Sequence, residues 1–226
     1  MPTVRLVRAP SEDEDLSVRR FLEFLKAHPN PFVGPRPDEL IRSAIGDESL
    51  FFVERENGDV IATAGFYRHN DRLAEIGSTL IDEAFQGCKL QSVIYFHVIA
   101  LKWLAEMIDF PTDVFAVVDE KATGSYKNIE RCGFHRFNSA PNRLVQAFPE
   151  GKWQAVESRA KRLYLLPREA VAKSLLFVAD HLREHSLINS EGVHMYDLMV
   201  EFPYLILPGA DQLLREEADR LSSSQD

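Results

Sequence analysis

The residues with the clearest chemical potential lie between Ala74 and Ser92, where a strand-like segment is followed by a short polar loop that contains Gly87. An apolar run typical of a long helix, Val93 to Met107, comes next. The first backbone N–H groups of a helix have no intrahelical partner, and the helix dipole makes that end positive. A helix that begins directly after a tight loop is therefore a site for phosphate or another anion. By itself, the stretch predicts a strand, a loop, a helix and an anion site.

Other reactive side chains carry weaker signals. Cys88 lies in the loop, but the sequence places no His beside it that would activate a thiolate. His97 falls on an apolar helix face and is expected to be a core residue, whereas His69 could line a substrate cleft at the end of a strand. No group of His, Cys, Asp and Glu has the spacing of metal ligands, so we predict no metal.

Composition narrows the class of protein. A formal charge of −9 and a pI of about 5.3 argue against binding to nucleic acid or to an anionic membrane, both of which need clustered Lys and Arg. Two cysteines give no disulfide framework and fit a reducing compartment. The N-terminus has no signal-peptide core, and polar residues interrupt the longest apolar run, Leu90 to Met107. We therefore expect a soluble cytoplasmic protein with a real hydrophobic core.

The hydrophobic pattern predicts the elements that position the loop. Strands are expected at 4–7, 50–54, 60–67, 73–81, 113–118 and 135–137, with an Asn57-Gly58 turn between the second and third. Helices are expected at 11–28, 37–46, from Leu90 onward and at 123–131, with Gly133 closing the last. This order predicts an α/β (α+β) fold, in which helices flank a mixed, mostly antiparallel sheet with a parallel crossover.

Residues 141–226 are expected to form a helical insertion or extension after a core of residues 1–140. Segments 153–163, 168–184 and 211–221 have helical patterns, whereas Met195 to Phe202 alternates like a strand. One arrangement makes 194–202 the last core strand and 142–192 a helical insertion. In the other, 162–166 closes the sheet and the remainder is an appendage for dimerisation or substrate capture. We favour the first arrangement and allow for a homodimer.

Two motifs within Val4 to Phe137 resemble those of the GNAT superfamily of N-acetyltransferases, and the element order is similar too. The family's loop reads Gln/Arg-x-x-Gly-x-Gly/Ala; here Gln86 occupies the first position, and Lys89 and Gln91 replace the small residues. The segment Ser125 to Phe134 resembles Asn-x-x-Ser/Ala-x-x-x-Tyr-Glu-Lys-x-Gly-Phe, with Ala122 at the Asn position and Ile129 at the Tyr position.

This resemblance implies an acyltransferase that moves an acetyl or other acyl group from CoA to a primary amine by direct attack in a ternary complex. An opening between strands 74–81 and 113–118 would admit the pantetheine arm, and backbone N–H near Ile81 would polarise the thioester. The implied acetyl-CoA contacts are Leu80, Ile81, Gln86, Gly87, Cys88, Lys89, Leu90, Gln91, Ser92 and Ser125.

The resemblance also implies two catalytic residues. Ala74-Glu75-Ile76 matches a strand segment of histone-type members, in which the Glu is the general base. An amine that attacks a thioester must lose a proton, and a nearby carboxylate can take it directly or through water. Tyr126 lies one helical turn before Ile129, so its hydroxyl is the predicted general acid.

Two alternatives remain open. The protein could be a binding or regulatory module of the same fold without acetyl-CoA turnover, as the residues at 89, 91, 122 and 129 suggest. It could also use a longer acyl-CoA or an acyl-carrier protein. The sequence does not identify the amine acceptor.

Overall fold

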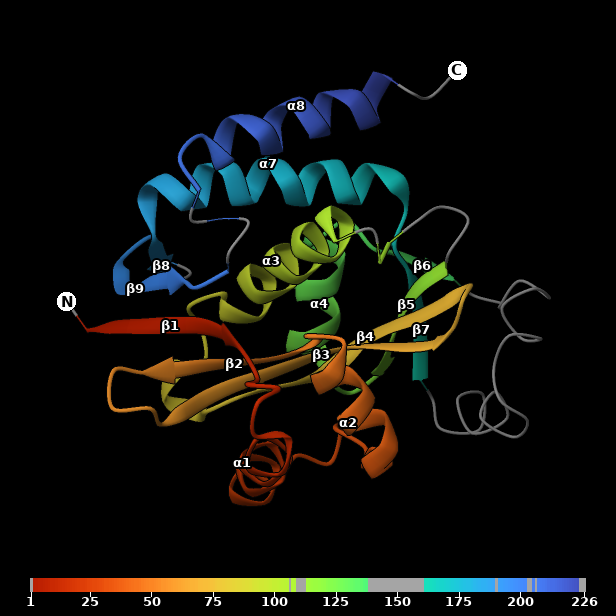
Figure 1. Ribbon diagram of the computed structural model, residues 1–226, viewed down its shortest axis with the longest axis vertical. Helices are drawn as coiled ribbons and strands as arrows, with labels where there is room; N and C mark the ends of the chain where they lie inside the picture. Colours follow the sequence, from red (N-terminus) through yellow and green to blue (C-terminus); the bar gives the residue numbers. More distant parts are fainter. Residues whose placement is uncertain are drawn as a thin grey trace.

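A nine-stranded sheet runs through the molecule, with helices on both of its faces (Figure 1). The computed structural model describes residues 2–105, 107–108, 113–137, 161–189, 191–202, 205 and 207–223. The strand order is β6-β7-β5-β4-β3-β2-β1-β9-β8. The strands are β1 (Thr3–Arg8), β2 (Leu50–Arg55), β3 (Val60–Asn70), β4 (Leu73–Ile81), β5 (Asp113–Asp119), β6 (His135–Phe137), β7 (Lys161–Leu165), β8 (Ser186–Ile188) and β9 (His194–Val200).

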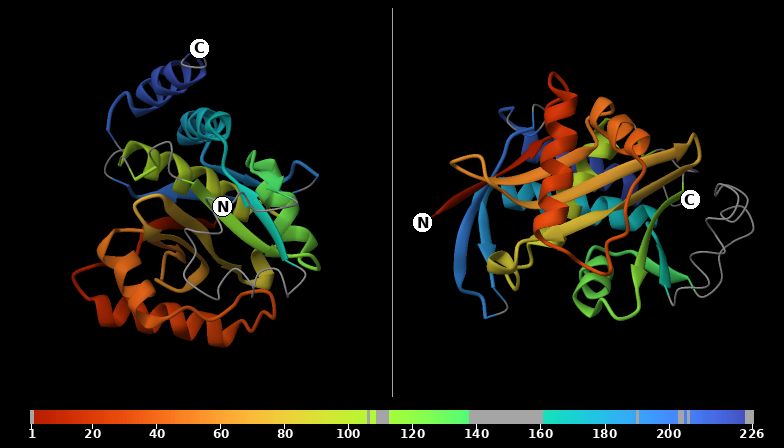
Figure 2. Two further views of the ribbon diagram at one scale, coloured as in Figure 1. Left: turned by 90° about the vertical axis from the view of Figure 1, so that its right-hand side faces the viewer. Right: turned by 90° about the horizontal axis from the view of Figure 1, so that it is seen from below.

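In the described part of the chain, helices cover both faces of the sheet (Figures 1 and 2). On the first face lie α1 (Glu14–Ala27) and α2 (Asp38–Gly46), and on the second lie α3 (Leu90–Leu104), α4 (Thr123–Arg131), α7 (Arg168–Glu184) and α8 (Ala210–Ser223). A short 3-10 helix, η1 (Glu83–Phe85), lies between β4 and α3. Most strand pairs are antiparallel, but β4–β5 and β1–β9 are parallel. The predicted mixed sheet with a parallel crossover and flanking helices is confirmed.

Local chemistry explains where the elements begin and end. The side chain of Asp13 caps α1 by accepting a hydrogen bond from the N–H of Leu16. Gly133 follows α4 with φ of +91°, and a Cβ there would lie 2.9 Å from Cβ of Ala170. A residue without a side chain is therefore needed at the end of α4, as the Gly-Phe motif predicted.

The main core lies between the sheet and α7, and α3 runs through it. Every residue from Leu90 to Lys102 is buried, so the helix is enclosed on most sides. His97 is fully buried, and its Nε2 lies 3.0 Å from Nδ1 of His181 on α7, so it is a core residue as predicted. Among the described residues, no helix combines the length and apolarity needed to cross a membrane.

The C-terminal region extends the sheet at both ends. Strand β7 pairs with β5 and β6, whereas β9 pairs with β1 on the opposite side. The helix expected at 153–163 is wrong for Lys161–Leu163, which belong to β7, and 153–160 lie outside the described residues. The favoured helical insertion over 142–192 is therefore wrong where β7 and β8 form, and within 194–202 the structure has the strand β9 over His194–Val200. The division into domains at residue 140 stays a prediction.

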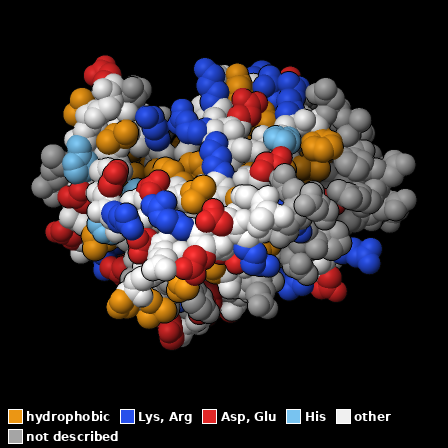
Figure 3. All heavy atoms as spheres, turned by 90° about the horizontal axis from the view of Figure 1, so that it is seen from above, with side chains coloured by type: hydrophobic (Ala, Val, Ile, Leu, Met, Phe, Trp, Pro, Cys, Tyr) orange, Lys and Arg blue, Asp and Glu red, His pale blue; other side chains and the backbone are white. Residues whose placement is uncertain are grey.

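Helices α7 and α8 form an outer layer above α3. Ion pairs Arg183–Asp211 and Arg215–Asp180 connect them. Seen from this side, basic and acidic side chains are mixed over the surface (Figure 3). The two ion pairs contribute to this mixture.

Candidate active site

A gap in the sheet, between β4 and β5, opens a cavity. Parallel pairing of β4 with β5 is limited to Leu73–Asp113, Ala74–Val114 and Glu75–Phe115. Beyond these pairs, residues 75–79 of β4 and 115–119 of β5 line a cavity of about 270 Å³. Other walls come from the α1–α2 loop, from α3 and α4, and from Lys161 of β7. The opening expected between the two strands is therefore present.

A bulge in β4 accompanies this divergence. In the β3–β4 register, Gly65 pairs with Gly77 but Thr63 pairs with Leu80, so β4 contains an extra residue. Ser78, within the bulge, has φ of +52°, a conformation that a non-glycine residue rarely adopts. Such a bulge bends its strand and interrupts pairing. It also turns the Ser78 hydroxyl toward Arg36, whose Nε donates to Oγ at 3.1 Å.

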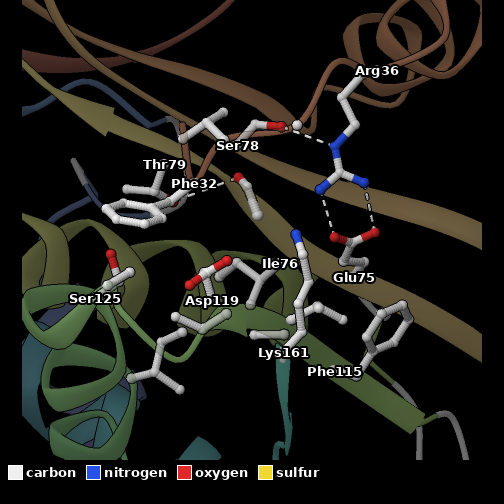
Figure 4. Close-up of a pocket in the computed structure, with 18 of the residues that line it drawn as sticks. Phe32, Arg36, Glu75, Ile76, Ser78, Thr79, Phe115, Asp119, Ser125 and Lys161 are labelled. Carbon is white, nitrogen blue, oxygen red and sulfur yellow. Dashed lines mark hydrogen bonds and ion pairs between the residues drawn. The ribbon is translucent and has the colours of Figure 1, made fainter. Parts of the chain in front are cut away.

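A buried charge cluster forms one end of the cavity (Figure 4). Arg36 donates from Nη1 to Oε2 of Glu75 at 2.8 Å and from Nη2 to Oε1 at 2.5 Å. Nε2 of His69 lies 3.1 Å from Oε2 of the same carboxylate. Gly77 leaves room for this arrangement, because a Cβ there would lie 2.8 Å from Nη2 of Arg36.

These contacts fix the ionisation of Glu75. Burial alone raises the pKa of its carboxyl, but the charge of Arg36 and the hydrogen bonds from His69 and Arg36 outweigh burial and lower the pKa to about 2. The carboxylate is thus a strong anchor for Arg36 and a weak proton acceptor. Its predicted role as general base stays a prediction, and this geometry supports a positioning role instead.

The backbone of the anion loop shows why the family's motif has glycine at the position of Lys89. Gly87 has φ of +87° and Lys89 has φ of +60°, so both adopt the left-handed conformation. The first hydrogen bonds of α3 run from the N–H groups of Ser92 and Val93 to the carbonyl of Lys89, so the N–H groups before them have no intrahelical partner. Cys88 is buried, its thiol donates to the carbonyl of Phe85 at 2.8 Å, and burial raises its pKa, so it is not activated as a nucleophile.

Gln91 connects the loop with the cavity. Its side chain, 8% exposed, turns inward, and Nε2 donates to the hydroxyl of Tyr95 at 3.4 Å. The amide therefore does not project from the helix start toward an anion, although the family motif has a small residue at this position.

Three of the predicted site residues line the cavity: Glu75, Gln91 and Ser125. Tyr126 does not line it; its ring packs against the guanidinium of Arg162, whose Cζ lies 4.4 Å from the ring centroid. The remaining predicted cofactor contacts also lie outside the lining: Leu80, Ile81, Gln86, Gly87, Cys88, Lys89, Leu90 and Ser92. Their assignment as acetyl-CoA contacts stays a prediction.

Sequence reasoning missed Arg36, Tyr95, Asp119 and Lys161, which all line the cavity. The side chain of Lys161 extends into it toward the Arg36–Glu75 pair (Figure 4). Tyr95 carried a signal that could have found it, because it lies four residues after Gln91 and thus on the same helix face. Arg36 lies in a Pro-rich loop, where no periodicity marks it.

In the described part of the chain, no three His, Cys, Asp or Glu side chains are arranged to hold a metal.

Comparison with known proteins identifies a related family. Residues 18–134, more than half of the chain, match the model of the acetyltransferase (GNAT) family. No curated protein matches the sequence significantly.

Several solved structures share the fold. A Mycobacterium tuberculosis protein in complex with CoA is 14% identical, covers 72% of this chain and 99% of its own, and has a TM-score of 0.51. An N-acetyltransferase from Staphylococcus aureus Mu50 is 12% identical, covers 72% of this chain and 96% of its own, and has a TM-score of 0.51. A spermidine N-acetyltransferase variant from Vibrio cholerae is 18% identical, covers 76% of this chain and 98% of its own, and has a TM-score of 0.50. At these identities the likeness is one of fold.

Proposed function

This chain belongs to the acetyltransferase (GNAT) family, and we propose that, within the family's acyl transfer from CoA, it moves an acetyl group to a primary amine by direct attack in a ternary complex. The family resemblance drawn from the sequence is thereby confirmed. The observation that carries the proposal is the cavity between β4 and β5, where strand pairing ends after Glu75–Phe115.

The proposal gives each end of this opening a task. The N–H groups at the start of α3, which have no intrahelical partner, suit the CoA pyrophosphate, with Gly87 allowing the backbone to turn. The pantetheine arm would enter between the strands and bring the thioester beside residues 76–79. Backbone N–H groups that no longer pair with β5 would then stabilise the oxyanion formed when the amine attacks.

The acceptor would approach from the charge cluster. Arg36, His69 and Glu75 form a fixed polar wall there, with Phe32 and Lys161 also lining the cavity. Because three donor contacts already hold its carboxylate, we assign Glu75 the task of positioning Arg36 and His69. The proton released by the amine would pass to solvent in the opening.

Calorimetry with acetyl-CoA, followed by an assay of CoA thiol release with a panel of primary amines, tests this function. We expect saturable binding and amine-dependent release of CoA. A failure to bind acetyl-CoA at millimolar concentration would refute the proposal. Competition by longer acyl-CoA thioesters would show which acyl group the cavity prefers.

One observation favours a second candidate, a CoA-binding or regulatory module without turnover. Ile129, which occupies the position of the family's acidic Tyr, lines the cavity and has no proton to donate. Binding of acetyl-CoA without CoA release for any amine would support this candidate. The cytoplasmic location and the homodimer expected from the sequence stay predictions.

A further inference from the structure

Tyr95 lines the cavity from α3, on the side of the gap between β4 and β5 where its hydroxyl meets Thr79. The residue is 3% exposed and lines the cavity together with Thr79, Gln91 and Ile129. Its hydroxyl is 3.0 Å from Oγ1 of Thr79 on β4. A phenol can release a proton as the hydroxyls of Ser and Thr cannot, so Tyr95 supplies at this wall the chemistry that Ile129 lacks.

A chain of hydrogen bonds determines which way the Gln91 amide faces. Arg131, which can only donate, gives a hydrogen bond from Nη1 to Oδ1 of Asn128 at 3.1 Å. The amide nitrogen of Asn128 therefore faces Oε1 of Gln91, to which it donates at 3.1 Å. As a result, Gln91 presents its own amide nitrogen to the Tyr95 oxygen at 3.4 Å.

The polarity of this chain leaves the phenol proton available. Gln91 Nε2 can only donate to the Tyr95 oxygen, so it does not take the phenol hydrogen, and the Thr79 hydroxyl, 3.0 Å from the same oxygen, is able to donate to it as well. Two donors aimed at one oxygen also stabilise the phenolate that would remain after proton transfer. Burial raises the pKa of Tyr95, and the hydrogen bonds from Thr79 and Gln91 oppose that rise, so the hydroxyl is protonated at neutral pH.

We propose that Tyr95 is the general acid that protonates the departing CoA sulfur, and that Gln91 positions it. When the tetrahedral intermediate breaks down, the C–S bond breaks and its electron pair goes to sulfur. The phenol proton moves to that sulfur, and the Tyr95 phenolate then regains a proton from solvent, which has received the one lost by the amine. The inference rests on the proposed acyl transfer.

Assigning Tyr95 as the general acid gives one explanation for two residues that differ from the family motifs. Gln91 stands where the loop motif has a small residue, and Ile129 stands where the helix motif has Tyr. Both side chains line the same cavity as Tyr95. The larger residue at 91 holds a phenol on α3, while α4 has Ile129 at the position of the motif's Tyr.

Tyr95→Phe tests the acid directly, because it removes one oxygen and retains the ring. We expect kcat for CoA release to fall by about 10²- to 10³-fold, within the range of a lost general acid. The Kd for acetyl-CoA should change by less than about threefold, since an interaction made only in the transition state has been removed. Tyr196→Phe is the matched control, because Tyr196 packs against Phe85, outside the cavity, and should leave kcat unchanged.

Gln91→Met tests the positioning residue and provides a second variant with a similar side-chain volume. We expect kcat to fall by about three- to tenfold in the wild-type background and not to change further in the Tyr95→Phe background, because the two residues act as a unit. A residue with a purely structural role would lower kcat equally in both backgrounds.

The outcomes separate this inference from the proposed function. Wild-type protein that releases no CoA would overturn both. If the wild type turns over and kcat of Tyr95→Phe lies within about twofold of the wild-type kcat, the general-acid role alone is overturned. So small a fall in kcat is far below that expected for the loss of a general acid. Loss of turnover in Tyr126→Phe, with Tyr95→Phe still active, would instead restore the acid predicted from the sequence.

Discussion

Replacement of Glu75 by Gln should destabilise the protein by about 3 kcal/mol at pH 7. In the folded state the pKa of this carboxyl falls from 4.5 to about 2, and each unit corresponds to about 1.4 kcal/mol. The Glu75 side chain is only 9% exposed, so solvent screens the pair weakly. An independent estimate agrees, because removal of one partner from a buried ion pair costs about 3 to 5 kcal/mol.

The dependence on pH has a definite sign. A carboxyl whose pKa is lowered by folding contributes stability above its unfolded pKa and loses that contribution as the pH falls toward the folded pKa. The difference in free energy of unfolding between wild type and Glu75→Gln should therefore reach its maximum at pH 7. It should be about 1 kcal/mol smaller at pH 4, and smaller still below that.

Urea denaturation at both pH values measures these differences through the midpoint and the slope. The double variant Arg36→Met/Glu75→Leu should be far more stable than the sum of Arg36→Met and Glu75→Leu predicts, because it leaves no unpaired buried charge. Asp71→Asn is the control, since it breaks the exposed Arg68–Asp71 pair and should cost less than about 0.5 kcal/mol. The reasoning fails if Glu75→Gln shifts the midpoint no more than Asp71→Asn does.

Three further predictions concern the backbone around the site and the core beneath it. Gly77→Ala should destabilise the protein by about 1 to 3 kcal/mol in urea, since the new Cβ would meet the Arg36 guanidinium, whereas Gly124→Ala, in the open on α4, should stabilise it by about 0.5 to 1 kcal/mol. Lys89→Gly should raise the thermal midpoint, because the left-handed conformation costs a non-glycine residue about 1 to 2 kcal/mol; an unchanged or lower midpoint would contradict this. Burial lowers the pKa of both His97 and His181, that of His181 to about 4, so they contribute stability above pH 6.5 that is lost as the pH falls toward 4. His181→Gln should flatten the fall in urea midpoint between pH 7 and pH 5, and an equally steep fall in the variant would refute the assignment.

The sequence by itself determined the local elements of this protein. The Asn57-Gly58 turn, with Gly58 at φ of +86°, predicted the hairpin, because its geometry depends on two adjacent residues. The ends of α3 and α4 were predicted for the same reason, since loop glycines and apolar periodicity act within a few positions. The order of these elements indicated the fold class, and the resemblance to the GNAT family implied the opening beside Glu75.

Only the tertiary structure decided what surrounds that opening. Arg36 meets Glu75 across 39 positions of sequence, and Asn128 meets Gln91 across 37, so no local pattern records either contact. Strands β7 and β9 likewise joined opposite sides of the sheet, because strand pairing depends on which neighbours packing makes available.

Contacts between residues far apart in the sequence also change the roles of the site residues. From the sequence, Glu75 is a carboxylate suited to accept a proton and Tyr126 is the nearest phenol to the missing one at 129. In the folded chain, Arg36 holds Glu75 ionised, and Tyr95 rather than Tyr126 lines the cavity. Residue type and spacing determine what a side chain is able to do, and long-range contacts determine its charge and direction.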